Sequence, residues 1–292
     1  MNESDKSIDA IIPIKNNSVV ILNICKVIRE AIQFNIRCIV ILDGFSKEEV
    51  INFKNTLGEI KNTDLVRIKS GIYGSPGLAR NAGLEISSSK WITFWDADDY
   101  PNPKAISNAL EMHSWNQIPI IGQFQMNSID TKTVSICDVA INPGIWRILF
   151  PKTAVASLRF SDKQWGEDQL FIAQTELLIN NARIVPHFFY NYQTGLSNQL
   201  TQNQRNVNDG VKSLIDIYKF NSKYRGSNKN LESQLILIIK LSATALKRFI
   251  FLDHIPKSLW QLLKINFLTF LNFKKNYIRA IYIVALQKKS AE

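Results

Sequence analysis

The chain has 292 residues, of which 46% are hydrophobic and 21% charged. These values are ordinary for a globular protein, and the length allows one large α/β domain with a smaller appendage. Three cysteines, Cys25, Cys38 and Cys137, lack metal-ligand spacing, so we expect structural thiols in a reducing compartment and no disulfide framework.

The net charge of +10 is concentrated near the C-terminus. Residues 1–211 hold 20 Lys and Arg against 21 Asp and Glu, a net charge of −1, whereas residues 212–292 hold 15 against 4, a net charge of +11. The polar N-terminus has no signal-peptide core, and the most apolar stretch, residues 265–273, is shorter than the roughly 20 residues of a membrane span. We therefore expect a cytoplasmic protein.

The first third of the chain alternates short apolar runs with amphipathic segments, about every 25 residues. The runs predict buried strands, and Ser46, with Glu49 three residues later, predicts a capping box that opens a helix. This alternation predicts an α/β fold with a doubly wound, mostly parallel sheet flanked by helices. The predicted strands are residues 8–14, 37–42, 65–68 and 91–95, and the first helix is residues 19–34.

Residues 75–100, SPGLARNAGLEISSSKWITFWDADDY, combine a helix, a strand and an acidic loop. Ser75 before Pro76 predicts a helix start. Leu78, Ala82 and Ile86 then recur every fourth residue and share one face of that helix.

Asp96, Asp98 and Asp99 follow the predicted strand directly. Ligands bind outside the carboxyl ends of strands in open α/β sheets, and carboxylates gathered there favour a hard divalent cation. The alternative is a solvated acidic turn closed by Pro101 and Pro103.

The next part of the chain predicts two helices with a strand between them. After Pro103 a helix to about residue 115 is expected, and residues 145–150 predict another strand. Gly166 predicts a turn before Glu167 and Asp168, which begin a helix; carboxylates are favoured at a helix N-terminus.

From about residue 205 the sequence predicts a helical C-terminal extension. The segments 231–252 and 257–287 are rich in Leu, Ile and Phe and interrupted by Lys or Arg. We therefore predict two domains, residues 1–204 and 205–292. The charge of residues 212–292 predicts peripheral binding to an anionic membrane surface. The alternative is a helical cap on the first domain.

The central block resembles the family 2 glycosyltransferases, inverting enzymes with the GT-A fold. The resemblance rests on Gly77-Leu78-Ala79-Arg80-Asn81-Ala82-Gly83 followed by Asp96-Ala97-Asp98-Asp99. Earlier segments add to it: Ile11-Ile12-Pro13-Ile14-Lys15-Asn16 and Asp43-Gly44-Phe45-Ser46. The family usually has an aromatic residue at the position of Lys15, Asp at that of Leu42, and no Phe45.

The resemblance implies a nucleoside diphosphate sugar donor, with UDP as the expected nucleotide, and a site at the strand ends. Pro13 and Lys15 would border the nucleotide, Asp43 would hold the base, Arg80 would lie near the nucleotide and Asp96 would face the ribose. Asp98 would be the ligand of Mg²⁺ or Mn²⁺. The alternative, if each residue is considered alone, is that Asp43 is a turn residue and Arg80 a surface charge on a helix.

The resemblance also implies the acceptor side. Glu167-Asp168-Gln169-Leu170-Phe171 matches the family's Glu-Asp-x-x-Phe motif, whose Asp is the catalytic base. Trp146 and Trp165 are candidate contacts of a glycan or lipid-linked acceptor, although Trp146 could equally be a core residue.

The implied activity is glycosyl transfer in bacterial lipopolysaccharide, capsule or other surface-glycan synthesis. The alternatives are a nucleotidyltransferase and a non-catalytic protein that binds nucleotide sugars. A nucleic-acid partner is not expected, because the N-terminal half offers no basic patch.

Overall fold

The computed structural model describes residues 7–15, 18–62, 64–113, 117–128, 134–137, 144–175, 182–194, 207–223, 228–249 and 257–289. The chain divides into two compact units. The sheet unit comprises Met1–Val139, Gly144–Asp162 and Ala182–Gly195, and the helical unit comprises Ala140–Pro143, Lys163–Asn181 and Leu196–Glu292.

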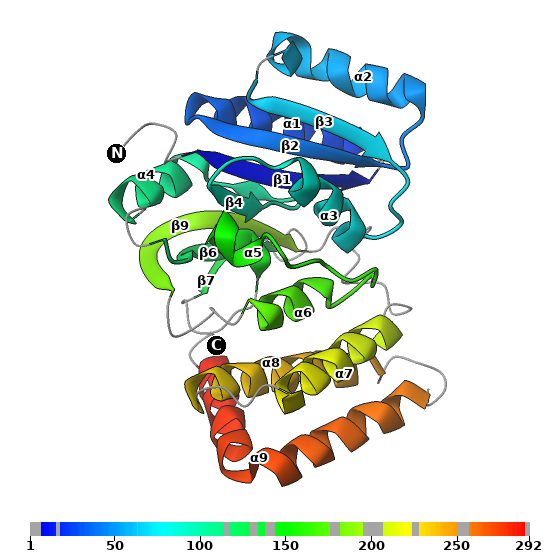
Figure 1. The fold of residues 1–292 in the computed structure, drawn as a ribbon, viewed down its shortest axis with the longest axis vertical. Helices are drawn as coiled ribbons and strands as arrows, with labels where there is room; N and C mark the ends of the chain where they lie inside the picture. Colours follow the sequence, from blue (N-terminus) through cyan, green and yellow to red (C-terminus); the bar gives the residue numbers. More distant parts are fainter. Residues whose placement is uncertain are drawn as a thin grey trace. The chain divides into compact units, whose positions relative to one another are not determined.

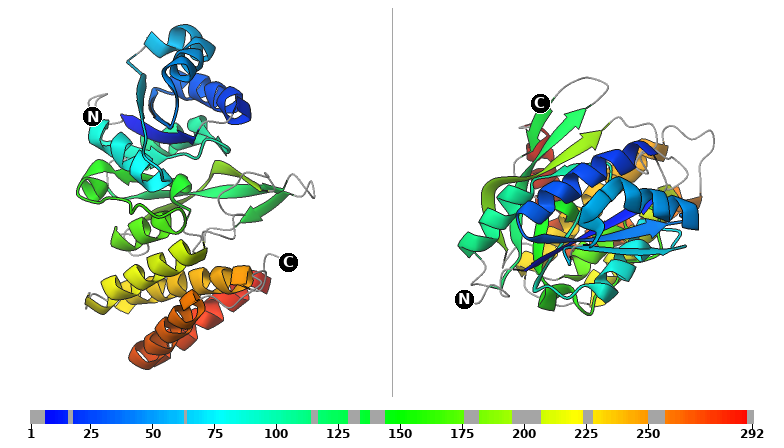
Figure 2. Two further views of the ribbon diagram at one scale, coloured as in Figure 1. Left: turned by 90° about the vertical axis from the view of Figure 1, so that its right-hand side faces the viewer. Right: turned by 90° about the horizontal axis from the view of Figure 1, so that it is seen from above.

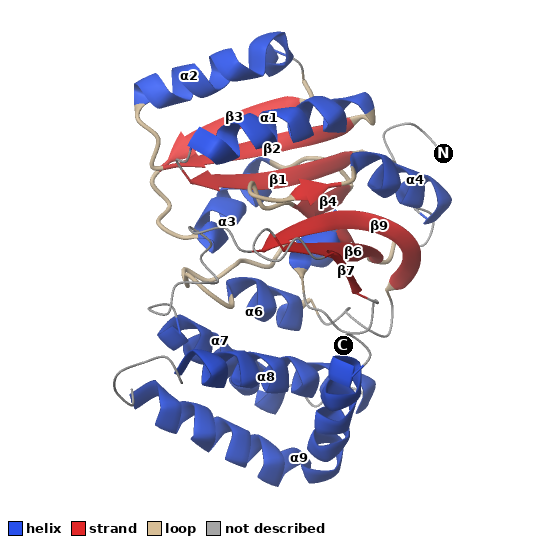
Figure 3. Ribbon diagram, turned by 180° about the vertical axis from the view of Figure 1, so that it is seen from behind, coloured by secondary structure: helices blue, strands red, loops and turns tan. Residues whose placement is uncertain are grey.

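The N-terminal part of the sheet is parallel, as the alternation of strands and helices predicts. Its strands are β1 (Ile8–Lys15), β2 (Ile36–Asp43), β3 (Val66–Gly71) and β4 (Trp91–Phe94), in the spatial order β3-β2-β1-β4. The helices α1 (Ser18–Gln33), α2 (Lys47–Leu57) and α3 (Pro76–Ile86) connect them, with a short 3-10 helix at Gly58–Asn62. Helix α1 lies on the face that carries α2, and α3 covers the opposite face (Figures 1 and 3).

The rest of the sheet is mixed. Antiparallel β8 (Ile148–Pro151) follows β4 in the sheet, and β6 (Ile120–Ser128) pairs with β8, with β7 (Val134–Cys137) and, in parallel, with β9 (Arg183–Thr194). The two-residue β5 (Tyr100–Pro101) closes this edge against β9. Helix α4 (Pro103–His113), α5 (Lys152–Val155) and a 3-10 turn at Ile145–Arg147 complete the unit. The predicted strand over residues 145–150 therefore begins only at Ile148.

Local sequence signals account for the helix starts. Ser46 and Glu49 form the predicted capping box of α2, and Ser75 Oγ accepts a hydrogen bond from Leu78 N at the start of α3. Gly83 lets α3 approach β1, because a Cβ there would lie 2.4 Å from Ile11 Cγ2. Leu78, which shares one face of α3 with Ala82 and Ile86, is 37% exposed, so this face is not buried along its whole length.

The amino ends of the parallel strands are held by one buried carboxylate, Asp9. Arg37 donates to both of its oxygens, at 2.7 and 3.0 Å, and Ser87, Ser88 and Ser89 donate four more hydrogen bonds. Burial by itself would raise the pKa of Asp9, but the hydrogen bonds from Arg37, Ser89 and Ser87 outweigh it and hold this pKa below the ordinary value.

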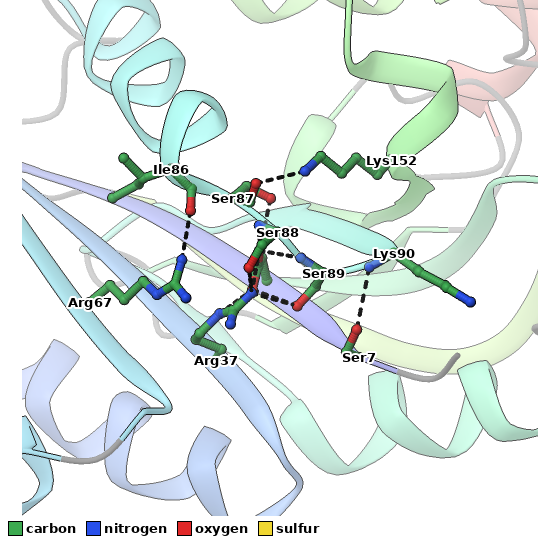
Figure 4. Close-up of polar contacts among 10 residues, drawn as sticks. Ser7, Arg37, Arg67, Ile86, Ser87, Ser88, Ser89, Lys90 and Lys152 are labelled. Carbon is green, nitrogen blue, oxygen red and sulfur yellow. Dashed lines mark hydrogen bonds and ion pairs between the residues drawn. The ribbon is translucent and has the colours of Figure 1, made fainter. Parts of the chain in front are cut away.

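The carboxyl end of α3 is bound by cations beside this cluster. Lys152 donates to Ser87 O at 2.7 Å and Arg67 to Ile86 O at 2.9 Å (Figure 4). Positive side chains are favoured at a helix C-terminus. The serine run that breaks the helix pattern in the sequence therefore joins α3 to β1 and β2.

The helical unit contains α6 (Glu167–Gln174), α7 (Val207–Lys223), α8 (Asn228–Phe249) and α9 (Lys257–Lys289). Helices α7, α8 and α9 pack against one another (Figures 1 and 2). Their shared core is apolar: Leu214, Ile217, Leu235, Ile238, Leu241 and Leu262. Helix α9 is kinked at Phe273.

The C-terminal helical extension is thus present, and α6 belongs with it by contacts. The predicted boundary near residue 204 lies outside the described residues and stays a prediction. None of the described helices has both the length and the hydropathy needed to cross a bilayer.

Candidate active site

The carboxyl ends of the parallel strands bring several predicted residues to one edge of the sheet. Lys15 and Asp43 are register partners at the ends of β1 and β2, and Asp96 lies two residues beyond β4. The pairing of β1 with β4 ends at Ile11. Pro13 lies beyond this point, so its missing N–H does not interrupt that pairing.

Asp43 organises the turn after β3. Its Oδ1 accepts hydrogen bonds from Tyr73 N at 2.6 Å and Gly74 N at 3.3 Å. Gly44 has a φ of 75° and donates its N–H to Gly71 O, so the ends of β2 and β3 are joined here. Asp43 is itself the last residue of β2, and its Oδ2 makes none of these bonds.

Arg80 is buried rather than a surface charge. It is 5% exposed and donates to Asp96 Oδ1 at 2.6 Å, and its guanidinium lies 5.4 Å from the centre of the Phe160 ring. A charge-assisted bond of this kind fixes the first carboxylate of the acidic loop. A buried arginine also brings positive charge to the strand ends.

Asn81, the neighbour of Arg80, has a role that the sequence did not indicate. Its Nδ2 donates to Phe160 O at 2.9 Å and its Oδ1 accepts from Phe160 N at 2.8 Å. These paired bonds hold the ring that packs on Arg80. The two residues lie 79 positions apart in the sequence, so no local sequence pattern predicts this contact.

Tyr190 and Gln193 on β9 hold the acidic loop from another side, and neither was singled out from the sequence. Asp96 N donates to Tyr190 Oη at 2.8 Å, and Gln193 N donates to Asp99 Oδ1 at 2.7 Å. Asp99 is 1% exposed. Burial, and next the charges of Asp96 and Asp98, raise the pKa of Asp99 well above its ordinary value, which the hydrogen bonds from Gln193 and Tyr190 only partly offset.

The acidic loop provides a setting that suits a divalent cation. Asp98 is half-buried, and the charges of Asp96 and Asp98 both act on Asp99. Within the described part of the chain, no three His, Cys, Asp or Glu side chains are grouped closely enough to hold a metal ion. Mg²⁺ commonly takes only one or two carboxylates and completes its shell with substrate phosphates and water, so this loop fits such an ion.

Trp146 belongs to an aromatic cluster in the sheet unit. Its ring stacks on Tyr190 and Tyr192, with centroids 4.5 and 5.4 Å apart, and meets the edge of Phe124 at 4.8 Å. It is buried, which accords with the interpretation as a core residue. Through Tyr190 this cluster supports the acidic loop.

In the helical unit, the segment before α6 is anchored on α7. Lys163 forms an ion pair with Asp216 at 2.6 Å, and Gln164 N donates to Asp209 Oδ2 at 3.1 Å. The Trp165 ring packs so closely on α7 that a Cβ at Gly210 would lie 2.0 Å from it. The predicted acceptor contact Trp165 is thus held in one position by α7.

Glu167 and Asp168 begin α6 after a turn that needs glycine. Gly166 has a φ of 82°, a left-handed conformation that other residues rarely adopt. Glu167 is buried, whereas Asp168 is half-buried and accepts from Gln169 N at 2.8 Å and Gln169 Nε2 at 3.2 Å. Asp168 therefore satisfies a backbone donor of the first turn, as the helix-start interpretation requires, and the role as a base remains a prediction.

Comparisons with known proteins identify the sheet unit's relatives. The sequence model of the family described as Glycosyl transferase family 2 matches residues 9–157, just over half of the chain. No curated protein matches the sequence.

Solved structures share the fold at low identity. TarS 1–349 of S. aureus in complex with UDP-GlcNAc has a TM-score of 0.58 at 13% identity, covering 94% of this chain and 79% of that one. The mannosyltransferase PcManGT of Pyrobaculum calidifontis, in complex with GDP-Man and Mn²⁺, has a TM-score of 0.54 at 11% identity, covering 95% and 85%. These likenesses concern the fold alone, and with the family match they confirm the GT-A class.

Proposed function

Because the chain belongs to glycosyl transferase family 2, we propose that it moves a sugar from a nucleoside diphosphate sugar, UDP-linked, to an acceptor hydroxyl with inversion at the anomeric carbon. The observation that carries this proposal is the acidic loop of residues 96–99 at the carboxyl end of β4, held by Arg80 and Tyr190. Parallel sheets bind ligands at this end of their strands.

The donor side of the proposal uses residues of the sheet unit. Asp43 Oδ2 accepts from the nucleobase, while Oδ1 stays committed to Tyr73 and Gly74. Asp96, oriented by Arg80, accepts from the ribose hydroxyls. Pro13 and Lys15 border the nucleotide at the end of β1. Bonds from a rigid strand end hold the donor in one orientation, which lowers the barrier to transfer.

Asp98 is the carboxylate that we assign to a divalent cation, Mg²⁺ or Mn²⁺. Such an ion supplies Lewis acidity that stabilises the negative charge of the leaving diphosphate. The assignment is supported by the half-buried position of Asp98 in the acidic loop at the carboxyl end of β4.

Asp168 is our candidate for the base. A hydroxyl is a weak nucleophile, and a carboxylate that accepts its proton during attack raises the rate. Attack opposite the leaving diphosphate inverts the anomeric carbon and needs no covalent intermediate. The match of residues 167–171 to the Glu-Asp-x-x-Phe motif supports this role, with Glu167 orienting the acceptor. Trp146 and Trp165 remain candidate acceptor contacts.

The proposed setting is surface-glycan synthesis, of lipopolysaccharide or capsule, at the inner face of the cytoplasmic membrane. The charge of +11 on residues 212–292 supports it, because a glycan or lipid-linked acceptor would be met at an anionic surface.

The decisive experiment incubates the purified protein with a panel of labelled nucleotide sugars, with Mg²⁺, Mn²⁺ or chelator. We expect metal-dependent turnover of one donor and a product anomer opposite to the donor's by NMR. Asp98→Ala should lose most of this turnover and bind the nucleotide more weakly, whereas Asp64→Ala, which removes an exposed turn carboxylate, should behave as the unaltered protein. Full activity in chelator would reject the metal assignment. Formation of a nucleoside triphosphate and a sugar 1-phosphate when pyrophosphate is added to the donor would instead indicate a nucleotidyltransferase.

A further inference from the structure

Helix α9 presents an apolar face that the helical unit does not cover. Trp260 is 69% exposed and Phe267 61%, and Leu263 and Leu271 are exposed as well. These four residues are spaced three, four and four apart, so they form one stripe along the helix. We call them the α9 stripe.

The opposite side of the same helix is the side that packs. The side chains of Ser258, Leu262, Ile265 and Thr269 are buried, with the spacing of a second stripe. Before the kink, α9 therefore has apolar side chains on both faces: Leu262 and Ile265 are buried in its unit, whereas the α9 stripe is exposed. An exposed row of Trp, Phe and Leu this long is unusual on a protein surface and marks an interaction site.

The charges on α9 itself all have one sign. Residues 257–289 contain seven Lys and Arg and no Asp or Glu. Lys257 and Lys264 are exposed beside the stripe, and Lys274 and Lys275 are exposed just beyond the kink at Phe273. A partner for this face must bury apolar side chains and carry negative charge.

We propose that the α9 stripe inserts into the interface of an anionic phospholipid bilayer while the lysines beside it contact the headgroups. Helices that lie in this interface combine Trp, Phe and Leu on one face with Lys nearby. The proposal names the surface that would make the membrane contact proposed above. It rests on that proposed function only for its biological meaning.

A second copy of the chain is a poorer occupant. A two-fold contact would place the same patch on both partners, and its lysines would face lysines. The acidic side chains with ion pairs in the helical unit, Asp209 and Asp216 on α7, are already joined to Lys212, Lys163 and Lys219.

The test is flotation of the full chain with vesicles of phosphatidylglycerol and phosphatidylcholine, compared with phosphatidylcholine alone. We expect binding only to the anionic vesicles, weakened by added salt. The double variant Trp260→Ser/Phe267→Ser should bind at least about tenfold more weakly, because two aromatic side chains no longer leave water. Lys257→Gln/Lys264→Gln should lose about fivefold for each lysine.

Matched controls lie in the sheet unit. Ile51→Ser removes an exposed apolar side chain of α2, and Lys104→Gln an exposed lysine of α4, and neither should alter flotation. Circular dichroism checks that each variant is folded. Equal loss in the controls, or no binding of the unaltered protein, would overturn the proposal.

Light scattering tests the alternative that a second copy of the chain covers the α9 stripe. A dimer that Trp260→Ser/Phe267→Ser converts to a monomer, without vesicle binding by either protein, would assign the α9 stripe to self-association. Flotation needs neither donor nor acceptor, so its failure leaves the proposed transferase reaction standing, and loss of that reaction leaves the flotation result standing.

Discussion

At the scale of single residues, the acidic loop contains three carboxylates in three different environments. Asp96 is neutralised by Arg80, Asp99 is buried with a raised pKa, and Asp98 is half-buried. Neighbouring acids repel one another, so such a division of roles lets one loop hold all three. The hydroxyl of Tyr190 joins the loop to β9.

The contribution of Tyr190 can be measured with Tyr190→Phe. The ring can keep its stacking on Trp146, but Asp96 N loses its acceptor in a partly buried place. An unsatisfied buried group costs about 1–3 kcal/mol, so chemical unfolding should show a loss of that size, and donor affinity should fall as the loop shifts. Tyr100→Phe, which alters an exposed tyrosine, is the control. Equal stability of the two variants would contradict the proposed role of the hydroxyl.

Asp168→Asn separates catalysis from helix capping. Asn keeps an oxygen that can accept from Gln169 N but removes the proton acceptor, so we expect turnover to fall by about 10²–10⁴-fold with nearly unchanged donor affinity. The measurement is turnover and donor binding on folded protein. Glu167→Gln should reduce turnover less, if Glu167 only orients the acceptor.

A purely structural Asp168 gives the opposite result. Turnover would then stay near normal, and the variant would lose about 1 kcal/mol of stability with the charge at the helix N-terminus. That outcome would leave the enzyme without an identified base.

At the scale of elements, one cluster of polar bonds fixes the amino ends of β1 and β2. Asp9 on β1 binds Arg37 on β2 and the serine run between α3 and β4 (Figure 4 shows the arginine and the serines). One buried carboxylate therefore ties three separate parts of the sheet unit together.

Asp9→Asn should destabilise the protein by about 3 kcal/mol at neutral pH, because it leaves the largely buried Arg37 without its partner charge. The pKa of Asp9 is lowered in the folded state, so its carboxylate stabilises the fold above the ordinary pKa of 3.8 and ceases to do so as the pH falls through the folded-state pKa. The difference between the two proteins in urea unfolding should thus shrink as the pH falls below 3.8. Asp64→Asn is the control, and a difference that stays constant with pH would contradict the linkage.

At the scale of the whole molecule, the two units differ in charge as well as in architecture. Residues 1–211 are nearly neutral and residues 212–292 carry a net charge of +11. The sheet unit carries the family match, while the helical unit carries the α9 stripe and its lysines. The proposed division between donor binding and membrane contact rests on this distribution, and flotation and donor-binding assays measure its two halves separately.

The sequence by itself determined the parallel part of the sheet and the helices that connect its strands. Strand runs, the capping box at Ser46 and the start of α3 at Ser75 are local signals, because each depends on residues within one or two turns. The motif at residues 77–99 likewise indicated the family that the comparison then established.

Only the tertiary structure decided how the acidic loop is supported. The bonds of Tyr190 to Asp96 and of Asn81 to Phe160 join residues 94 and 79 positions apart. Arg80 is buried and Leu78 exposed, in reverse of what their polarity suggests. Such contacts depend on which elements the fold brings side by side, and the local sequence, which sets propensity and periodicity, contains no record of that choice.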